Sequence, residues 1–316
     1  MKVIDLINSS KSTAFSFEIL PPLKGNSIQK VYNVIDKLIE FDPKYINITS
    51  HHSEYIYKTL PDGSFQKVNI RKRPGSVAIA SAIQNKYGIT AVPHIICKGF
   101  TKDETEYALI DLNFLGVYDL LLLRGDVKTL EAGQKTDIYH EHATDLQQQV
   151  NDFNKGIAID GSVFEANETP FSYGMACYPE KHEEAPNMES DIFYLKEKVK
   201  NGADYLVTQM FFDNEKYYAF VDRCRAEGIT VPSIPGIKPI VFKNQLTVLP
   251  KIFRSDIPEP FATELRKCKT DDEAKAVGVE WCIQQCKDLI AHGVPSLHFY
   301  TMMASDSVYK VAKEVY

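Results

Sequence analysis

Short apolar runs alternate with amphipathic segments along most of the chain. Eight of these runs predict β-strands: 14–20, 44–49, 90–96, 118–124, 172–178, 204–210, 230–235 and 295–301. Most contain consecutive β-branched, aromatic or leucine residues without regular polar alternation, which is typical of strands covered on both faces. The runs therefore predict a buried, mainly parallel sheet.

Helical patterns fill the intervals between these strands. Residues 27–40 place Val31, Val34, Ile35, Leu38 and Ile39 on one face. Similar spacing predicts helices over 102–115, 140–153, 189–201, 214–227, 271–292 and 305–315, and Gly116, Gly202, Gly228 and Gly293 each follow one of them. This alternation predicts an α/β fold, a (β/α)8 TIM barrel formed by one domain over residues 1–316. The alternative is a doubly wound open sheet, although no G-x-G-x-x-G fingerprint is present.

Two segments depart from this rhythm. Residues 53–70 alternate on both sides of Asp62-Gly63, and residues 156–164 do so around Asp160-Gly161. Because Asp-Gly favours tight turns between antiparallel strands, both segments predict β-hairpins added to the barrel. The first follows strand 44–49 and should decorate the carboxyl-end face; the second should have its root at the opposite face.

Composition narrows the class of protein. The 316 residues are 44% apolar and 25% charged, with a formal net charge of −6, which argues against a general nucleic-acid binder. No apolar run is long enough to cross a membrane, and residues 1–13 lack a signal-peptide pattern, so we expect a cytoplasmic protein. The six cysteines are then expected to be reduced thiols. Cys282 and Cys286 alone are a weak metal signal, and we expect no metal site.

Polar side chains gather where the predicted strands end. They are Glu18, Thr49, His94, Arg124, Asp126, Tyr178, Glu180, His182, Gln209 and Tyr300. Each has an ordinary structural interpretation, as a capping residue, a paired charge or a hydrogen-bonded core group. Because active sites of TIM barrels lie at the carboxyl ends of the strands, the joint pattern predicts the site there.

Glu18 is the most unusual of these residues, since it interrupts the apolar strand "FSFEIL" just before Pro21 and Pro22. Burial disfavours a charged carboxylate, so its pKa should be raised, which suits a general acid. Asp126 follows Arg124-Gly125 and should be ionised beside the arginine. Two carboxylates in unlike environments imply two roles, and they also leave a glycosidase open as an alternative. The histidines lack familiar metal-ligand spacing, which disfavours a metal hydrolase.

At these residues the sequence resembles the methylenetetrahydrofolate reductase family. The matching motifs occur in order along nearly the whole chain: "FSFEILPP", "INIT", "VPHIIC", "LLRGD", "YPEKHEEA", "LKEKVKNGADYLVTQMFFD", "IPGIKPI" and "LHFYT". The resemblance implies a barrel that binds FAD without a Rossmann fold. It also implies ping-pong reduction of 5,10-methylenetetrahydrofolate to 5-methyltetrahydrofolate by NADH or NADPH, feeding methionine synthesis.

The resemblance also implies roles for individual residues. Glu18 matches the general acid, and Asp126 matches a catalytic residue that meets the pterin and tunes the flavin. Gln209 and Gln245 match folate contacts, alongside Glu18 and Asp126. The flavin-site positions are Thr49, His94, Arg124, Gly125, Asp126, Ala143, Tyr178, His182, Ala185, Asp191 and Lys198. Lys198 would face the diphosphate.

Some positions depart from the family pattern. Ala304 stands where many members have an arginine that contacts the folate tail. The 53–70 hairpin is longer than in compact bacterial members, and we expect it to shape the dinucleotide site. The resemblance implies a homo-oligomer and small-molecule partners only, and we expect no C-terminal regulatory domain. The alternatives to this function are another flavin-dependent barrel oxidoreductase and a barrel that serves as a non-catalytic scaffold.

Overall fold

The predicted barrel is confirmed by the computed structural model, which describes residues 1–51, 54–125, 138–302 and 305–316. Its strands are β1 (Ala14–Ile19), β2 (Tyr45–Ile48), β5 (Thr90–Ile96), β6 (Asp119–Leu123), β7 (Ser172–Cys177), β8 (Tyr205–Thr208), β9 (Ser233–Ile234), β10 (Gly236–Ile237) and β11 (Ser296–Tyr300). They form one sheet in the order β10-β11-β1-β2-β5-β6-β7-β8-β9. Every neighbouring pair is parallel.

The two edges of this sheet belong to consecutive segments of chain. β9 pairs with β8, β10 pairs with β11, and only Pro235 separates them. The seventh predicted strand, 230–235, is therefore split in two and ends further along the chain than expected. Proline has no N–H to donate to a ladder, which explains the break. The sheet closes into a barrel through this segment.

Alternation along β1 assigns its side chains to two environments. Phe15, Phe17 and Ile19 lie in the apolar core between the sheet and the surrounding helices. Ser16 and Glu18 therefore occupy the opposite face, inside the barrel, although all six residues of the strand are buried. Burial on both faces is why the sequence shows no regular alternation of polar and apolar residues here.

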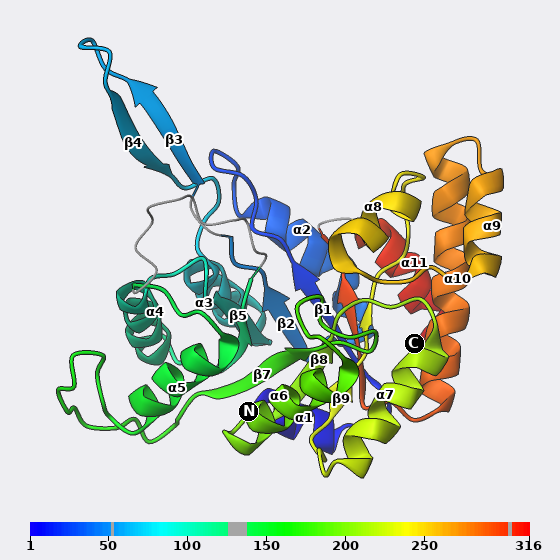
Figure 1. The fold of residues 1–316 in the computed structure, drawn as a ribbon. Helices are drawn as coiled ribbons and strands as arrows, with labels where there is room; N and C mark the ends of the chain where they lie inside the picture. Colours follow the sequence, from blue (N-terminus) through cyan, green and yellow to red (C-terminus); the bar gives the residue numbers. More distant parts are fainter. Residues whose placement is uncertain (52–53, 126–137, 303–304) are drawn as a thin grey trace.

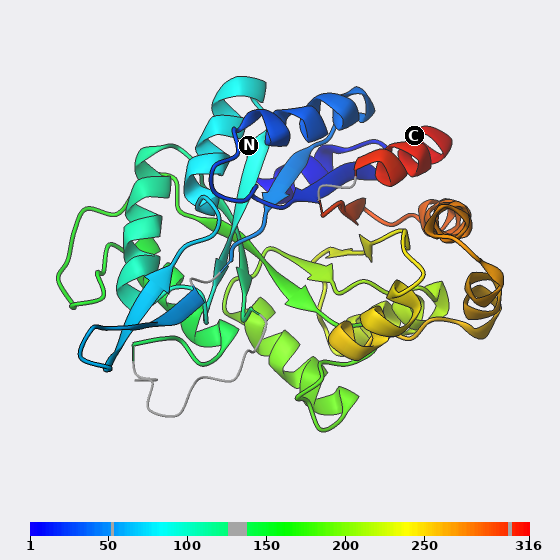
Figure 2. The same cartoon turned by 90° about the horizontal axis from the view of Figure 1, so that it is seen from above.

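Helices surround the strands, as Figure 2 shows. Predicted helices are found as α2 (Gln29–Leu38), α4 (Lys102–Phe114), α5 (Ala143–Asn154), α6 (Met188–Lys200), α7 (Asn214–Ala226), α10 (Asp271–Ala291) and α11 (Ser305–Val315), and Ile39–Phe41 continues α2 as a 3-10 turn. The structure adds α1 (Val3–Ser9), α3 (Ser76–Tyr87), α8 (Gln245–Phe253) and α9 (Glu259–Lys267). α8 and α9 are short and contain a proline inside or at the first turn, which weakened their sequence signal.

Helix α1 closes the amino end of the barrel. The Val3 N–H donates to Asp119 Oδ1 over 2.8 Å, at the first residue of β6. Val3 and Ile7 pack with Tyr45 and Tyr205 in the interior apolar cluster. Helix α1 therefore covers this end, and the polar strand-end residues lie at the opposite end.

The first predicted hairpin is confirmed as β3 (Glu54–Thr59) and β4 (Phe65–Ile70), an antiparallel pair. It projects away from the barrel on the side opposite α9 and α10 (Figure 1). The second predicted hairpin is reduced to one antiparallel bridge between Ile157 and Val163, between α5 and β7. Two residues of pairing are too few for regular strands.

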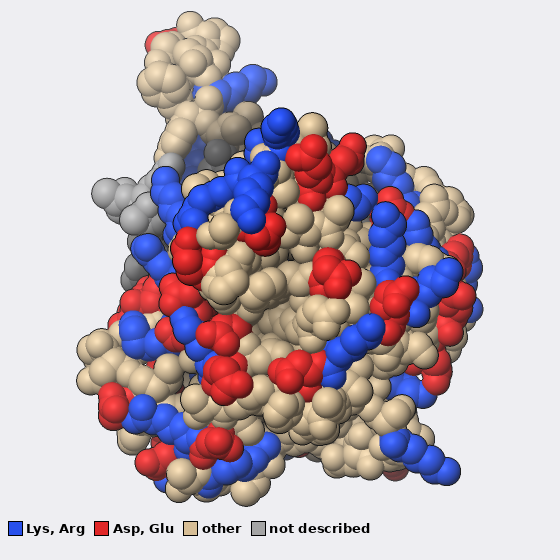
Figure 3. Space-filling view, turned by 90° about the vertical axis from the view of Figure 1, so that its right-hand side faces the viewer, with Lys and Arg blue, Asp and Glu red and all other residues tan. Residues whose placement is uncertain are grey.

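Surface charge is mixed on the face seen in Figure 3, where basic and acidic side chains are interspersed over the helices. Such a face has no extended field of one sign. Among the described residues, no helix is long and apolar enough to span a bilayer.

Candidate functional site

Glu18 lies near the carboxyl end of β1, inside the barrel, and is 7% exposed. Burial raises its pKa to about 8, and the charge of Lys238 opposes this shift. A carboxyl group with this pKa is mostly protonated at neutral pH, as a general acid must be. Thr301 Oγ1 donates to the Glu18 backbone oxygen and connects β1 to the residue after β11. The sequence prediction of a buried carboxyl group at this strand end agrees with this geometry.

His94 is the nearest titratable partner of Glu18. Its Nε2 lies 3.6 Å from Glu18 Oε2, at the end of β5. Burial lowers the pKa of His94 to about 3, so the ring is neutral at neutral pH. The pair is therefore two neutral groups rather than an ion pair, and 3.6 Å is too long for a good hydrogen bond. His94 Nε2 has no hydrogen-bond partner among the described residues, which leaves it available to a ligand.

Further polar side chains lie inside the barrel, with Asn47 level with Glu18, and Ser16 and His298 below it. Ser16 Oγ and His298 Nδ1 are 3.0 Å apart, and the His298 ring stacks on Tyr45. Burial lowers the pKa of His298 to about 3, so it is also neutral. Both polar atoms of the Asn47 side chain lack a partner in the described structure. Buried polar atoms normally bind something, so ordered water or a ligand atom is expected here.

Basic side chains gather around the carboxyl ends of β5, β6 and β7. Arg124 follows β6, contacts Glu184, and donates from Nε to the Glu141 carbonyl over 3.2 Å. Burial lowers the pKa of Lys98, and the nearby Arg124 lowers it further. Burial also lowers the pKa of His182, and the charges of Lys198 and Arg124 lower it further. Lys98 and His182 therefore both lie near the charge of Arg124, and His182 also lies near that of Lys198.

Lys198 reaches this cluster from α6. Its Nζ donates to the Ala176 carbonyl over 3.1 Å. Burial lowers its pKa, while the charge of Asp191 acts in the opposite direction. Asp191 Oδ2 also accepts from the His182 backbone N–H over 2.7 Å, so the same carboxylate holds the His182 loop and acts on the charge of Lys198.

The loop after β7 is held in an unusual conformation. Lys181 has φ +81°, a left-handed value that is rare for a lysine. Its Nζ donates to the carbonyls of His182 and Ala185 over 2.9 and 2.5 Å. The Tyr178 and His182 rings meet edge to face, with centroids 4.7 Å apart. This folding of the loop brings Tyr178, His182 and Ala185 to the same end of the barrel.

Smaller predicted residues lie around the same mouth. Gly125 has φ +81°, and a Cβ there would come within 3.3 Å of Ile96. Thr49 follows β2 and is half-buried, with Oγ1 3.4 Å from His51 Nε2. Ala143 is the first residue of α5. Gly125 can bring its backbone close to a ligand, because glycine carries no side chain of its own.

The two glutamines differ in how they are engaged. Gln209 follows β8, and its Oε1 accepts from the Met210 N–H over 2.9 Å. Gln245 begins α8, and its Oε1 accepts from Val241 and Phe242 over 2.7 and 3.1 Å. The Gln245 carbonyl thus orders its own loop, which leaves its NH2 group for a ligand. Asp126 and Ala304 lie outside the described residues.

Two further charged residues are Glu180, which the sequence predicted for the site, and Lys238, which it did not. Glu180 accepts from Lys216 Nζ over 2.8 Å and from the Asp256 N–H, so it joins its own loop to α7 and to the loop after α8. Lys238, directly after β10, is a residue that the sequence reasoning missed. Its signal was a lone charge in the apolar run "IPGIKPI", the same kind of signal that identified Glu18.

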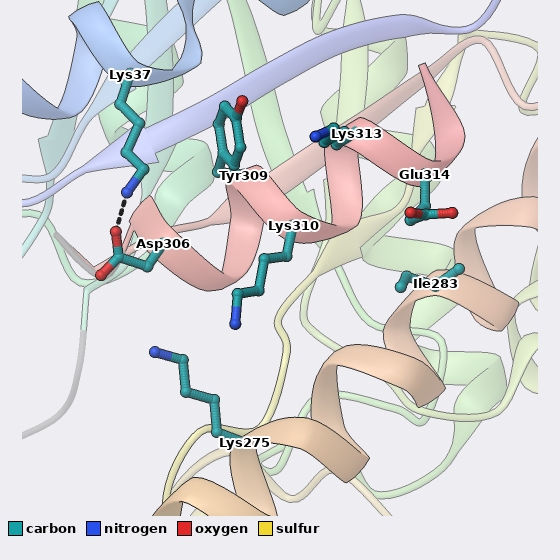
Figure 4. Close-up of a pocket in the computed structure, with 8 residues that line it drawn as sticks. All are labelled: Lys37, Lys275, Ile283, Asp306, Tyr309, Lys310, Lys313 and Glu314. Carbon is teal, nitrogen blue, oxygen red and sulfur yellow. Dashed lines mark hydrogen bonds and ion pairs between the residues drawn. The ribbon is translucent and has the colours of Figure 1, made fainter.

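A separate hollow of about 510 Å³ lies outside the barrel (Figure 4). Its lining residues come from α2, α10 and α11, among them Lys37, Lys275 and Tyr309. Lys37 is bound to Asp306 there. The hollow is built by the outer helices and includes none of the strand-end residues.

Comparison with known proteins adds a family to this geometry. A family model described as Methylenetetrahydrofolate reductase matches residues 2–316. The chain is 30% identical over 297 residues to the 5,10-methylenetetrahydrofolate reductase of Escherichia coli (strain K12), covering 94% of this chain and 88% of that protein. It is also 30% identical over 315 residues to the probable methylenetetrahydrofolate reductase (NADPH) of Caenorhabditis elegans. The match covers 99% of this chain but 43% of that protein, so the chain spans less than half its length.

Among solved structures, an uncharacterized protein from Clostridium thermocellum that binds two copies of 5-methyl-5,6,7,8-tetrahydrofolic acid is similar. The TM-score is 0.55 at 14% identity, over 98% of this chain and 97% of the other. At this identity the likeness shows the fold alone.

Proposed function

The chain belongs to the methylenetetrahydrofolate reductase family, and on that premise we propose that it is an FAD-dependent enzyme. It reduces 5,10-methylenetetrahydrofolate to 5-methyltetrahydrofolate with NADH or NADPH as the electron donor. The observation that carries this proposal is Glu18, a carboxyl group buried at the barrel mouth with its pKa raised to about 8.

The residues at the mouth suit FAD. A diphosphate needs nearby positive charge and backbone that a flat ligand can approach. Arg124 and Lys198 supply positive charge, His182 supplies a neutral imidazole beside them, and Gly125 supplies backbone that carries no side chain of its own. Thr49, Ala143, Tyr178, Ala185 and Asp191 complete the proposed site. When bound, FAD supplies a carrier that takes up hydride from the nicotinamide cofactor and delivers it to the folate.

The protein's own part is proton transfer and orientation. Protonated Glu18 donates to a ring nitrogen of the folate, which opens the five-membered ring and makes its carbon the acceptor of hydride. Glu18 is left as a carboxylate and recovers its proton from solvent. Neutral His94, 3.6 Å away, places no charge beside this carboxyl group, so Glu18 stays protonated until it gives up its proton.

Gln209 and the NH2 group of Gln245 are proposed to contact the folate. The role of Asp126, meeting the pterin and tuning the flavin, stays a prediction from the resemblance.

The purified protein provides the first test. It should be yellow, with a flavin absorbance band at about 450 nm. Anaerobic stopped-flow with NADH and with NADPH should bleach this absorbance, and added methylenetetrahydrofolate should restore it. Protein that neither contains nor takes up FAD would refute the proposal. Bleaching without reoxidation by the folate would indicate another flavin-dependent oxidoreductase.

Glu18→Gln tests the proton donor. The variant should keep flavin reduction by the nicotinamide cofactor and lose folate reduction, since general acid catalysis contributes about 10²–10⁴-fold. Glu168→Gln, an exposed loop glutamate, is the matched control. Equal loss of both half-reactions in folded Glu18→Gln protein would contradict the assignment. Size-exclusion chromatography with light scattering tests the proposed homo-oligomer.

A further inference from the structure

Lys238 occupies a position beside Glu18 that the strand register fixes. In the β10–β11 pairing, Gly236 is opposite His298 and Ile237 is opposite Phe299. Lys238 is the next residue, so it comes level with Tyr300. In the β1–β11 pairing, Tyr300 is opposite Glu18. Lys238 and Glu18 therefore flank Tyr300 at one level of the barrel mouth.

Side-chain alternation turns Lys238 toward the interior. Ile237 and Phe299 lie in the outer apolar core. The residue after Ile237 is thus directed to the opposite face, which is also the face of Glu18. Lys238 is only partly buried, so its ammonium group lies at the mouth rather than deep in the barrel.

The other groups facing Glu18 carry no charge at neutral pH. His94 from β5 and His298 from β11 are neutral because burial lowers both pKa values to about 3. Burial raises the pKa of the Tyr300 phenol well above its ordinary value. Asn47 from β2 is not titratable. Among the described residues, Lys238 is the charged group that acts on Glu18.

Lys238 is also not neutralised by direct contact. No ion pair within 4.0 Å joins its Nζ to a carboxylate of the described residues, Glu18 included. Burial lowers its pKa, and the nearby Glu18 acts in the opposite direction. A contact ion pair would lock Glu18 as a carboxylate, whereas a charge at longer range leaves it protonated until the proton is needed.

We propose that Lys238 is a positioning residue that stabilises the carboxylate formed when Glu18 gives its proton to the folate. This inference rests on the proposed function. The O–H bond of Glu18 breaks, an N–H bond forms on the folate ring nitrogen, and the negative charge left on Glu18 faces the Lys238 ammonium. The hydride comes from the nicotinamide cofactor through FAD, and solvent returns the proton to Glu18.

The test compares Lys238→Met with Lys238→Arg. Removing the positive charge should raise the pKa of Glu18 further. A general acid works only while protonated, so the rate of the folate half-reaction falls as pH rises past the Glu18 pKa. This alkaline limb of the pH–rate profile should move to higher pH in Lys238→Met. Its maximal rate should fall, because the carboxylate product is less stable. Lys238→Arg keeps the charge and should restore the wild-type limb. A purely structural role would change rates and thermal stability without moving the limb.

Carboxyl-carbon NMR makes the test independent of turnover. The Glu18 signal is assigned by its absence in Glu18→Gln and titrated in wild type, Lys238→Met and Lys238→Arg. An upward shift of the titration in Lys238→Met alone supports the inference. The same midpoint in all three proteins would overturn it, whatever the kinetics show. An NMR shift in a protein that does not reduce methylenetetrahydrofolate would refute the proposed function and leave the electrostatic coupling established.

Discussion

Replacing Glu18 with glutamine should stabilise the protein, and the gain should grow with pH. The folded protein keeps the Glu18 proton up to a pKa of about 8, while the reference value for the unfolded chain is 4.5. Between these values the unfolded state releases a proton that the folded state retains. Wild-type stability is therefore lost as pH rises through this window, and a glutamine has no such term.

The size of the effect follows from the same two values. Each pH unit inside the window costs the wild type about 1.4 kcal/mol. Partial ionisation near the lower limit reduces the first unit, so the loss between pH 5 and pH 7 is about 2.5 kcal/mol. The difference in unfolding free energy between Glu18→Gln and wild type isolates this effect, because all other titrating groups are shared by the two proteins.

Urea unfolding of the FAD-free proteins at pH 5, 6, 7 and 8 measures this difference. FAD is omitted because a ligand that binds only the folded state adds its own stabilisation. The exposed Glu168→Gln variant should show a difference from wild type that is small at every pH. A stability difference for Glu18→Gln that stays constant from pH 5 to pH 8 would show that Glu18 is ionised in the folded protein. The general-acid role would then lose its physical basis.

Three further outcomes are expected. Lys198→Met should weaken FAD binding at least about tenfold, which is the cost of one charge-assisted hydrogen bond. Lys196→Met is the control on the same helix, since it removes only an exposed ion pair with Glu227 and should leave FAD binding unchanged. Fluorescence titration with FAD measures both affinities. Gly125→Ala should lower the free energy of unfolding by about 1–2 kcal/mol, because φ is +81° there, and an unchanged urea midpoint would contradict the strain. Replacing residues 54–70 with a short glycine-serine linker should leave the melting temperature nearly unchanged, since β3 and β4 pair only with each other. The same replacement should raise the KM for the nicotinamide cofactor. An unchanged KM would exclude the hairpin from the dinucleotide site.

Several features of the fold were predictable because they are local. The apolar runs and the helical spacing between them are properties of short segments, and they yielded the strands and seven of the helices. Of the helices that were missed, α1 is only seven residues long, α3 lacks a clear apolar stripe, and α8 and α9 contain proline. The 156–164 segment was wrong as a full hairpin, because a turn signal at Asp160-Gly161 does not supply a sheet face for strands to bury.

The sequence by itself determined that Glu18 is buried and that polar residues collect at strand ends, since both follow from charges placed within apolar runs. Only the tertiary structure decided which of these residues meet. Glu18 and His94 are 76 positions apart and come within 3.6 Å because β2 alone separates their strands. Lys238 comes level with Glu18 because the barrel closes at Pro235 and sets β10 two strands from β1. Sheet order and closure depend on the packing of the whole chain, so no local pattern contains them.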